Sequence, residues 1–145
     1  MTELPEELVP LKRFHGHLGP YVVIGYRMGK LARERFKGKM TAVVFTGKHP
    51  PMSCLIDGVQ FTTGCTLGKN NIVVRDGNAP VVHFIDSEKT LEVRLLDSER
   101  VRIDGSMTKH NEERLSVDIL NAAEKDIFLV TEVGLGFPER LVKLK

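Results

Sequence analysis

Two histidines and two cysteines form the most chemically informative group of side chains in this sequence. His15 and His17 flank Gly16, and Cys54 and Cys65 lie in a second segment further along the chain. Imidazole nitrogen and thiolate sulfur are ligands that Zn²⁺ accepts together in a tetrahedral site. The spacing is not the short Cys-x-x-Cys of a zinc finger. These residue types predict a metal site built from two segments, with Zn²⁺ as the expected ion and Ni²⁺ or Fe²⁺ as alternatives.

The histidine pair comes just before a segment with the pattern of a long helix. Residues at i and i+2 of an extended backbone point to the same side, and Gly16 places no side chain between them. The positive end of a helix dipole favours the neutral imidazole at His17, which is the form that binds a metal. We expect His15 and His17 to be metal ligands. The alternative is that one of them caps backbone groups and the other is exposed.

Cys54 lies where a second helix is predicted to begin, after Pro50 and Pro51. A helix N-terminus lowers the pKa of a thiol, and the thiolate is both a nucleophile and a metal ligand. Cys54 is therefore a candidate metal ligand and a candidate catalytic nucleophile. Asp57, three residues later, is placed to orient an imidazole through its second N–H group. The alternative is that Cys54 is a small buried apolar residue.

A glycine-rich loop follows this helix and reads GCTLGKNN over residues 64–71. It differs from a phosphate-binding P-loop because it is one residue too short and has Asn in place of the Ser or Thr that binds Mg²⁺. The loop therefore does not predict nucleotide hydrolysis. We expect Lys69 and Asn70 to lie beside the metal site and attract an anionic substrate. The alternative is that Lys69 is a solvated residue on a turn.

The pattern of apolar residues predicts the elements that position these side chains. Gly19 and Pro20 mark the start of a central helix, in which Gly25 and Gly29 are expected to let another element pack closely. The Asp-Gly-Asn sequence at 76–78 predicts a hairpin between the strands on either side. Helices are predicted at residues 5–13, 20–37, 51–63 and 111–124, and strands at residues 40–47, 71–75, 80–86, 90–96, 127–133 and 140–144.

These elements predict an α+β fold in which N-terminal helices pack on a mostly antiparallel β-sheet, as a single domain over residues 1–145. The C-terminal part, residues 72–145, contains no cysteine and no paired histidines. We therefore expect that part to be scaffold without metal ligands. The sequence shows no ligand spacing that involves His49, His83 or His110. We therefore predict no function for these three histidines.

Composition excludes several classes of protein. The chain has 145 residues, of which 41% are hydrophobic and 28% charged, so it is not a disordered tail. The net charge of +2 is not clustered in a basic segment, which argues against nucleic-acid binding. A membrane span needs about 20 consecutive apolar residues, and the longest apolar run is much shorter. The N-terminal segment lacks the features of a signal peptide, so a cytoplasmic protein with reduced cysteines is expected.

The two chemical segments also resemble a known family. Residues 14–20 read FHGHLGP and residues 54–71 read CLIDGVQFTTGCTLGKNN. They are similar to the FmdE-like family, named for the E subunit of formylmethanofuran dehydrogenase. The pattern of that family is F-H-G-H-x-C-P-G, then a glycine-containing helix, then C-x-x-D-x-x-Q-x-x-T-G-C-T-x-G-K-x-N. One departure is Gly19, which stands where many members have a cysteine. The resemblance implies the α+β core domain of that family.

The resemblance implies a homodimer and a cleft lined by His15, His17, Cys54 and Cys65. It also implies a metal-binding accessory protein, linked to one-carbon or methanogenesis-type metabolism or to molybdenum and tungsten enzymes, with a larger enzyme complex as a further partner. It does not imply formylmethanofuran oxidation, because two cysteines cannot hold the iron–sulfur clusters of that reaction.

Two other functions are open at this point. One is a small enzyme that uses Cys54 or a metal-bound water on an anionic substrate. The other is an interaction module in which the histidines and cysteines are packing residues.

Overall fold

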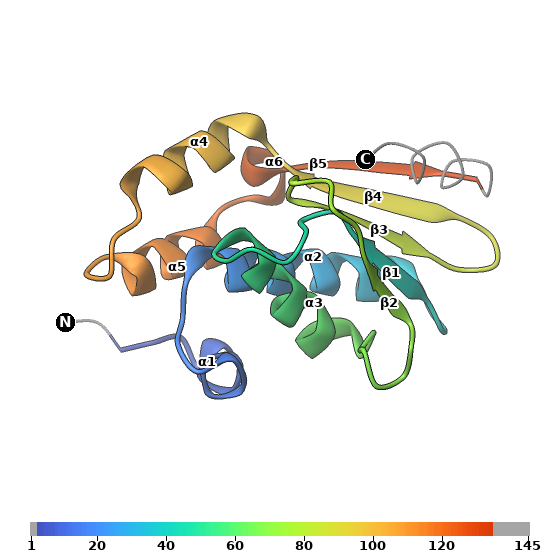
Figure 1. Cartoon of the computed structure of the whole chain (residues 1–145), viewed down its shortest axis with the longest axis horizontal. Helices are drawn as coiled ribbons and strands as arrows, with labels where there is room; N and C mark the ends of the chain where they lie inside the picture. The colour runs from blue at the N-terminus through green and yellow to red at the C-terminus, as the bar shows by residue number, and fades with distance from the viewer. Residues whose placement is uncertain (1–2, 135–145) are drawn as a thin grey trace.

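The structure is a computed structural model that describes residues 3–134, and Figure 1 shows its arrangement. The elements in chain order are α1 (Leu8–His15), α2 (Pro20–Arg35), β1 (Thr41–Val44), the short 3-10 helix η1 (Met52–Cys54), α3 (Leu55–Thr63), β2 (Ile72–Val74), β3 (Val81–Ile85), β4 (Thr90–Leu95), α4 (Asp97–Ser106), α5 (Glu112–Asn121), α6 (Glu124–Ile127) and β5 (Phe128–Val133). The predicted strand at residues 140–144 lies outside the described residues.

The described strands form a five-stranded sheet with the order β2-β1-β3-β4-β5. β1 pairs with β3, β3 with β4 and β4 with β5, all antiparallel, whereas β1 and β2 are parallel. The predicted α+β class, with helices on a mostly antiparallel sheet, is confirmed.

The predicted hairpin around residues 76–78 is wrong. The chain does reverse direction between β2 and β3, with bends at Ala79 and Pro80, but β2 pairs with β1, with Ala42 opposite Ile72, and β1 separates β2 from β3. β1 takes the inner position because its side chains are apolar on both faces: Ala42 and Val44 face the helices, and Val43 packs in a second cluster on the other face. A strand buried on both faces favours the middle of a sheet. The turn sequence predicts the local bend but not the partner strand.

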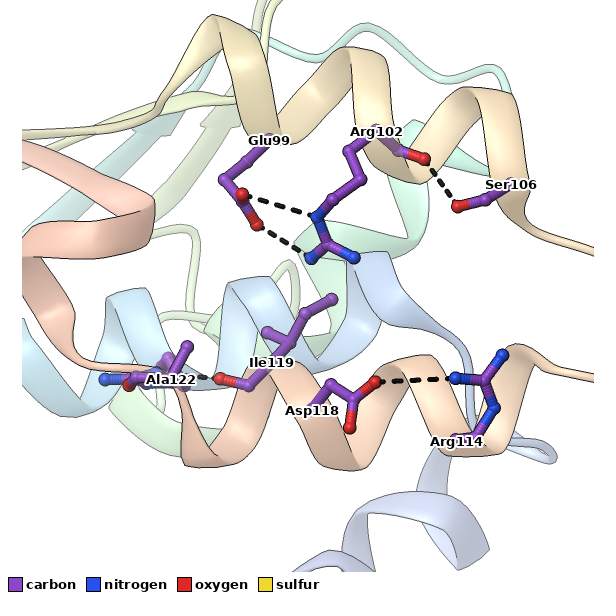
Figure 2. A network of polar contacts seen from close by, with 8 residues as sticks. Glu99, Arg102, Ser106, Arg114, Asp118, Ile119 and Ala122 are labelled. Carbon is purple, nitrogen blue, oxygen red and sulfur yellow. Dashed lines mark hydrogen bonds and ion pairs between the residues drawn. The ribbon is translucent and has the colours of Figure 1, made fainter.

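Helix α4 was not predicted, because its sequence has little amphipathic pattern and Ile103 is its only buried residue. Tertiary contacts hold it in place instead. The buried Tyr21 hydroxyl of α2 donates a hydrogen bond of 2.6 Å to Asp104. Figure 2 shows α4 running beside α5, with the Glu99–Arg102 ion pair of α4 opposite α5.

The helix predicted at residues 111–124 is divided into two. Helix α5 ends at Asn121, and the Arg27 guanidinium of α2 donates hydrogen bonds to the carbonyl oxygens of Ile119 and Ala122. These bonds satisfy acceptors that the end of a helix leaves free. Ala123 is exposed between α5 and α6.

Helix α2 is the central element of the core and packs closely against α3. Most of its residues are buried, and Pro20 occupies its first turn as predicted. A Cβ atom at Gly25 would collide with the backbone carbonyl of Leu55, and one at Gly58 with that of Val22. The predicted close approach at Gly25 is therefore confirmed, and glycines on both helices provide it. This contact fixes the position of α3, whose two ends carry the candidate site residues.

Among the described residues, no helix is both long enough and apolar enough to cross a membrane.

Candidate metal centre

The two histidines lie at the junction between α1 and α2. His15 is the last residue of α1, and Gly16 follows in the left-handed conformation with φ of 100°. Its backbone N–H donates to the carbonyl of Lys12 at 2.7 Å, which completes the last turn of α1. The expected extended backbone is therefore wrong, because this glycine-capped helix end replaces it. The two imidazole rings nevertheless come together, with their centroids 4.7 Å apart.

His15 is held by a carboxylate of α3. Its Nδ1 lies 2.6 Å from Oδ2 of Asp57, and the imidazole side chain is only 8% exposed. The carboxylate accepts, so Nδ1 carries the hydrogen and the neutral ring keeps a free lone pair on Nε2. Nε2 is buried and has no hydrogen-bond partner in the described structure. A histidine that is oriented by a carboxylate and has its other nitrogen free is the arrangement found at metal ligands.

His17 faces a different carboxylate and is more open to solvent. Its Nδ1 lies 3.6 Å from Oε1 of Glu112, and its side chain is 56% exposed. Glu112 lies in the first turn of α5, which places a residue of the predicted scaffold region beside the site. The expectation that residues 72–145 only build the scaffold is too broad for this reason. An acidic residue at a helix start already has an explanation in the helix dipole, so the sequence held no separate signal for Glu112.

Cys54 precedes the first residue of α3 and is half-buried. The predicted lowering of its pKa is wrong. Burial raises the pKa of the Cys54 thiol, and the negative charges of Asp57 and Glu112 raise it further. The two carboxylates that contact the histidines therefore also act on the thiol. His15, His17 and Cys54 therefore share an acidic neighbourhood formed by Asp57 and Glu112.

These donors do not form a preassembled coordination site. Within residues 3–134, no group of three or more His, Cys, Asp or Glu side chains is arranged to hold a metal ion. The region instead combines one fixed imidazole, His15, with a more exposed imidazole and a half-buried thiol from neighbouring elements. The residue types still fit a borderline metal such as Zn²⁺, and the buried free nitrogen of His15 is the atom best prepared to bind one.

The other predicted site residues lie at the opposite end of α3. Cys65 is 1% exposed, and its Sγ donates to the carbonyl of Met40 at 3.4 Å. Lys69 lines a cavity together with Cys65. Asn70 is an exposed turn residue with φ of 61°. The nine residues of α3 rise about 1.5 Å each, so this end of the helix is well separated from Cys54.

The fold and the site define an α+β protein with a histidine, thiol and carboxylate cluster at the ends of its N-terminal helices. The sequence profile of a family described as FmdE, molybdenum formylmethanofuran dehydrogenase operon, matches residues 14–129. The chain belongs to the FmdE family, as its two sequence segments predict. The match extends past both segments and includes Glu112.

Two relatives support this assignment. The crystal structure of a tungsten formylmethanofuran dehydrogenase FmdE-like protein from Syntrophus aciditrophicus is 25% identical, with a TM-score of 0.66, and the match covers 94% of this chain and 80% of that one. A probable S-adenosyl-L-methionine-binding protein of Archaeoglobus fulgidus is 33% identical over 107 residues. That match covers 70% of this chain but only 29% of the relative.

Proposed function

We propose that this chain is a metal-binding accessory protein of the FmdE family, with a centre formed by His15, His17 and Cys54. The proposal rests mainly on the hydrogen-bonding environment of His15. Its Nδ1 is bound to Asp57 at 2.6 Å, and its Nε2 is buried without a partner in the described structure. A buried nitrogen acceptor without a partner is costly unless a ligand satisfies it. A divalent cation, Zn²⁺ first and Ni²⁺ or Fe²⁺ as alternatives, supplies that partner.

The charges around the site favour a cation. A helix N-terminus repels positive charge, and Cys54 stands at the start of α3. Asp57 and Glu112 offset that repulsion with two negative charges beside the donors. The same carboxylates raise the pKa of the Cys54 thiol in the metal-free protein. A bound cation reverses this effect, because metal coordination stabilises the thiolate.

Binding requires a local rearrangement of two side chains. His15 is fixed by Asp57, so the proposed centre requires the exposed His17 and the half-buried Cys54 to turn toward its Nε2. Three protein ligands leave a fourth tetrahedral position for water, a substrate or a group from a partner.

The names of the family and of one relative support a metabolic role for the proposed centre. Its description names the molybdenum formylmethanofuran dehydrogenase operon, and the similar Syntrophus aciditrophicus protein is named for a tungsten enzyme of that kind. The proposed role is therefore that of an accessory protein in one-carbon or methanogenesis-type metabolism. It acts as a homodimer or within a larger enzyme complex.

The alternative in which Cys54 is a catalytic nucleophile has weaker support. A nucleophilic cysteine needs a stabilised thiolate. Burial, Asp57 and Glu112 all favour the neutral thiol of Cys54 in the metal-free protein. A metal-bound water acting on an anionic substrate stays compatible with the proposed centre.

The metal content of purified, untagged protein tests the proposal. After incubation with Zn²⁺, Ni²⁺ or Fe²⁺ and removal of free metal, wild type is expected to retain about one ion per chain by plasma mass spectrometry. His15→Ala and Cys54→Ser are expected to lose most of it. His49→Ala is the matched control and should retain it, because His49 is an exposed residue outside the cluster. Equal metal content in all four proteins, or none in wild type, would reject the metal centre.

A further inference from the structure

A large cavity opens at the end of α3 that is remote from the histidines. Its volume is about 1060 Å³, and it lies where the ends of α2 and α3 meet β1 and the turn after β3. The side chains of Arg33, Lys37, Lys39 and Lys69 line it. Its size is at the upper end of the range for sites that bind small molecules. The proposed metal centre uses none of these residues.

The cavity carries excess positive charge. Asp86 is the only acidic residue among the described residues that line it, against four cationic side chains. The C-terminal ends of α2 and α3 contribute about half a negative charge each, which leaves a net charge of about +2. The four basic side chains therefore carry more positive charge than the two helix ends and Asp86 neutralise.

Most of this positive charge is free to meet a ligand. Lys37, Lys39 and Lys69 form no ion pair with any other residue that the structure describes. The carboxylate of Asp86 is already hydrogen-bonded. Its Oδ1 accepts hydrogen bonds from the backbone N–H groups of Glu88 and Lys89 at 2.8 and 2.9 Å. Three flexible ammonium groups thus line the cavity without an ion-pair partner among the described residues.

Apolar and neutral groups complete the cavity. Phe36 and Met40 are buried side chains in its lining, and Thr63 and Cys65 come from the end of α3 and the segment that follows it. One face of the Phe36 ring is already covered by the Lys89 ammonium, 5.1 Å from the ring centroid. The lining therefore combines several cations with an apolar surface, so a matching ligand has both an anionic and an apolar part.

We propose that this cavity binds a phosphorylated small molecule of nucleotide size. Lysine ammonium groups and an arginine guanidinium are the side chains that recognise phosphate oxygens, and several of them together favour a group with more than one negative charge. A single phosphate would leave most of the volume empty, so the ligand carries an organic part as well. The proposal also gives a role to the loop residues Cys65 and Lys69, which lie away from the histidines.

Isothermal titration calorimetry with pyrophosphate and ADP tests this site. The measurement uses the full chain at low salt, with a chelator present to remove metal. Pyrophosphate is expected to bind, ADP to bind more tightly because it fills more of the cavity, and adenosine not to bind. The double variant Lys37→Ala/Lys69→Ala is expected to weaken ADP binding by about tenfold or more. The matched control, Lys109→Ala/Lys125→Ala, removes the same charge from exposed positions outside the cavity and should leave binding unchanged.

Each other outcome counts against the proposal. No binding of pyrophosphate or ADP below millimolar concentration would reject the site. Equal weakening by both double variants would show that general surface charge is responsible. Tighter binding of a single-stranded oligonucleotide than of ADP would reassign the surface to a macromolecule. The His15→Ala variant is expected to bind ADP like wild type, so the result is independent of the metal centre.

Discussion

The carboxylate of Asp57 determines how His15 can act. Its hydrogen bond to Nδ1 fixes the ring and leaves Nε2 with a lone pair in a buried position. A carboxylate in this position also makes the ring a stronger ligand, because it stabilises positive charge on the imidazole. Asp57 thus has a defined task even though it is not itself a proposed ligand.

Asp57→Asn is expected to weaken Zn²⁺ binding by about 10-fold to 100-fold. The amide oxygen can still accept the Nδ1 hydrogen, but the negative charge is lost. Competition with a chromophoric chelator measures the affinity. Asp76→Asn is a suitable control, since Asp76 is an exposed residue on a different loop. An unchanged affinity in Asp57→Asn would contradict the assigned role.

Cys54 is expected to react slowly with iodoacetamide near neutral pH in the metal-free protein. Burial and the charges of Asp57 and Glu112 raise its pKa, so the reactive thiolate is scarce. Glu112→Gln removes one of these charges, lowers the pKa and should accelerate the reaction. Mass spectrometry in a Cys65→Ser background measures Cys54 alone. Alkylation faster than that of free cysteine would support a nucleophilic thiolate instead.

At the scale of elements, the contact between α2 and α3 positions both ends of α3. Gly58→Ala should lower the free energy of unfolding by about 1–3 kcal/mol or more, because the new methyl group meets the backbone of α2, which cannot rotate away. Urea denaturation measures the change. Gly105→Ala in α4 is the matched control: its Cβ would meet open space, so stability should be unchanged or rise by up to about 1 kcal/mol. Equal changes in unfolding free energy in the two variants would show that the close approach of α2 and α3 does not contribute to stability.

The pair formed by β3 and β4 makes stability depend on pH. His83 contacts Glu92 at 3.2 Å, and this hydrogen bond, with a further contribution from Arg94, lowers the pKa of Glu92. A carboxylate with a lowered folded-state pKa stabilises the fold above its unfolded pKa of about 4.3, and this stabilisation is lost as the pH falls through the folded value. Glu92→Gln should therefore be less stable at neutral pH and lose less stability in acid. Parallel slopes of unfolding free energy against pH in both proteins would contradict this.

The order of the strands shows the limit of what local patterns predict. The position of β3 follows from a run of β-branched and aromatic residues and that of β4 from alternating apolar residues, and the ends of α1 and α3 follow from Gly16 and Gly64. The parallel pairing of β1 with β2 depends on which strand is buried on both faces. That is a property of the assembled sheet, and so is the position of α4.

At the scale of the whole molecule, the sequence pattern of residues 54–71 divides between two places. Its first half lies beside the histidines and its second half lines the cationic cavity. Continuity in sequence favoured a single cleft, but α3 is a rigid rod of about 14 Å that separates the halves. His15, His17, Cys54 and Asp57 could be placed together from their residue types and spacing. Glu112 could not, because only tertiary folding brings α5 to this end of the molecule.

The absorption spectrum of the Co²⁺-loaded protein tests the proposed metal centre most directly. Co²⁺ substitutes for Zn²⁺ and absorbs in the near ultraviolet when a thiolate is among its ligands. Wild type and Cys65→Ser are expected to show this band, Cys54→Ser to lose it, and His15→Ala to bind Co²⁺ much more weakly. A band that persists in Cys54→Ser, or the absence of any Co²⁺ spectrum in wild type, would contradict a centre built on His15, His17 and Cys54.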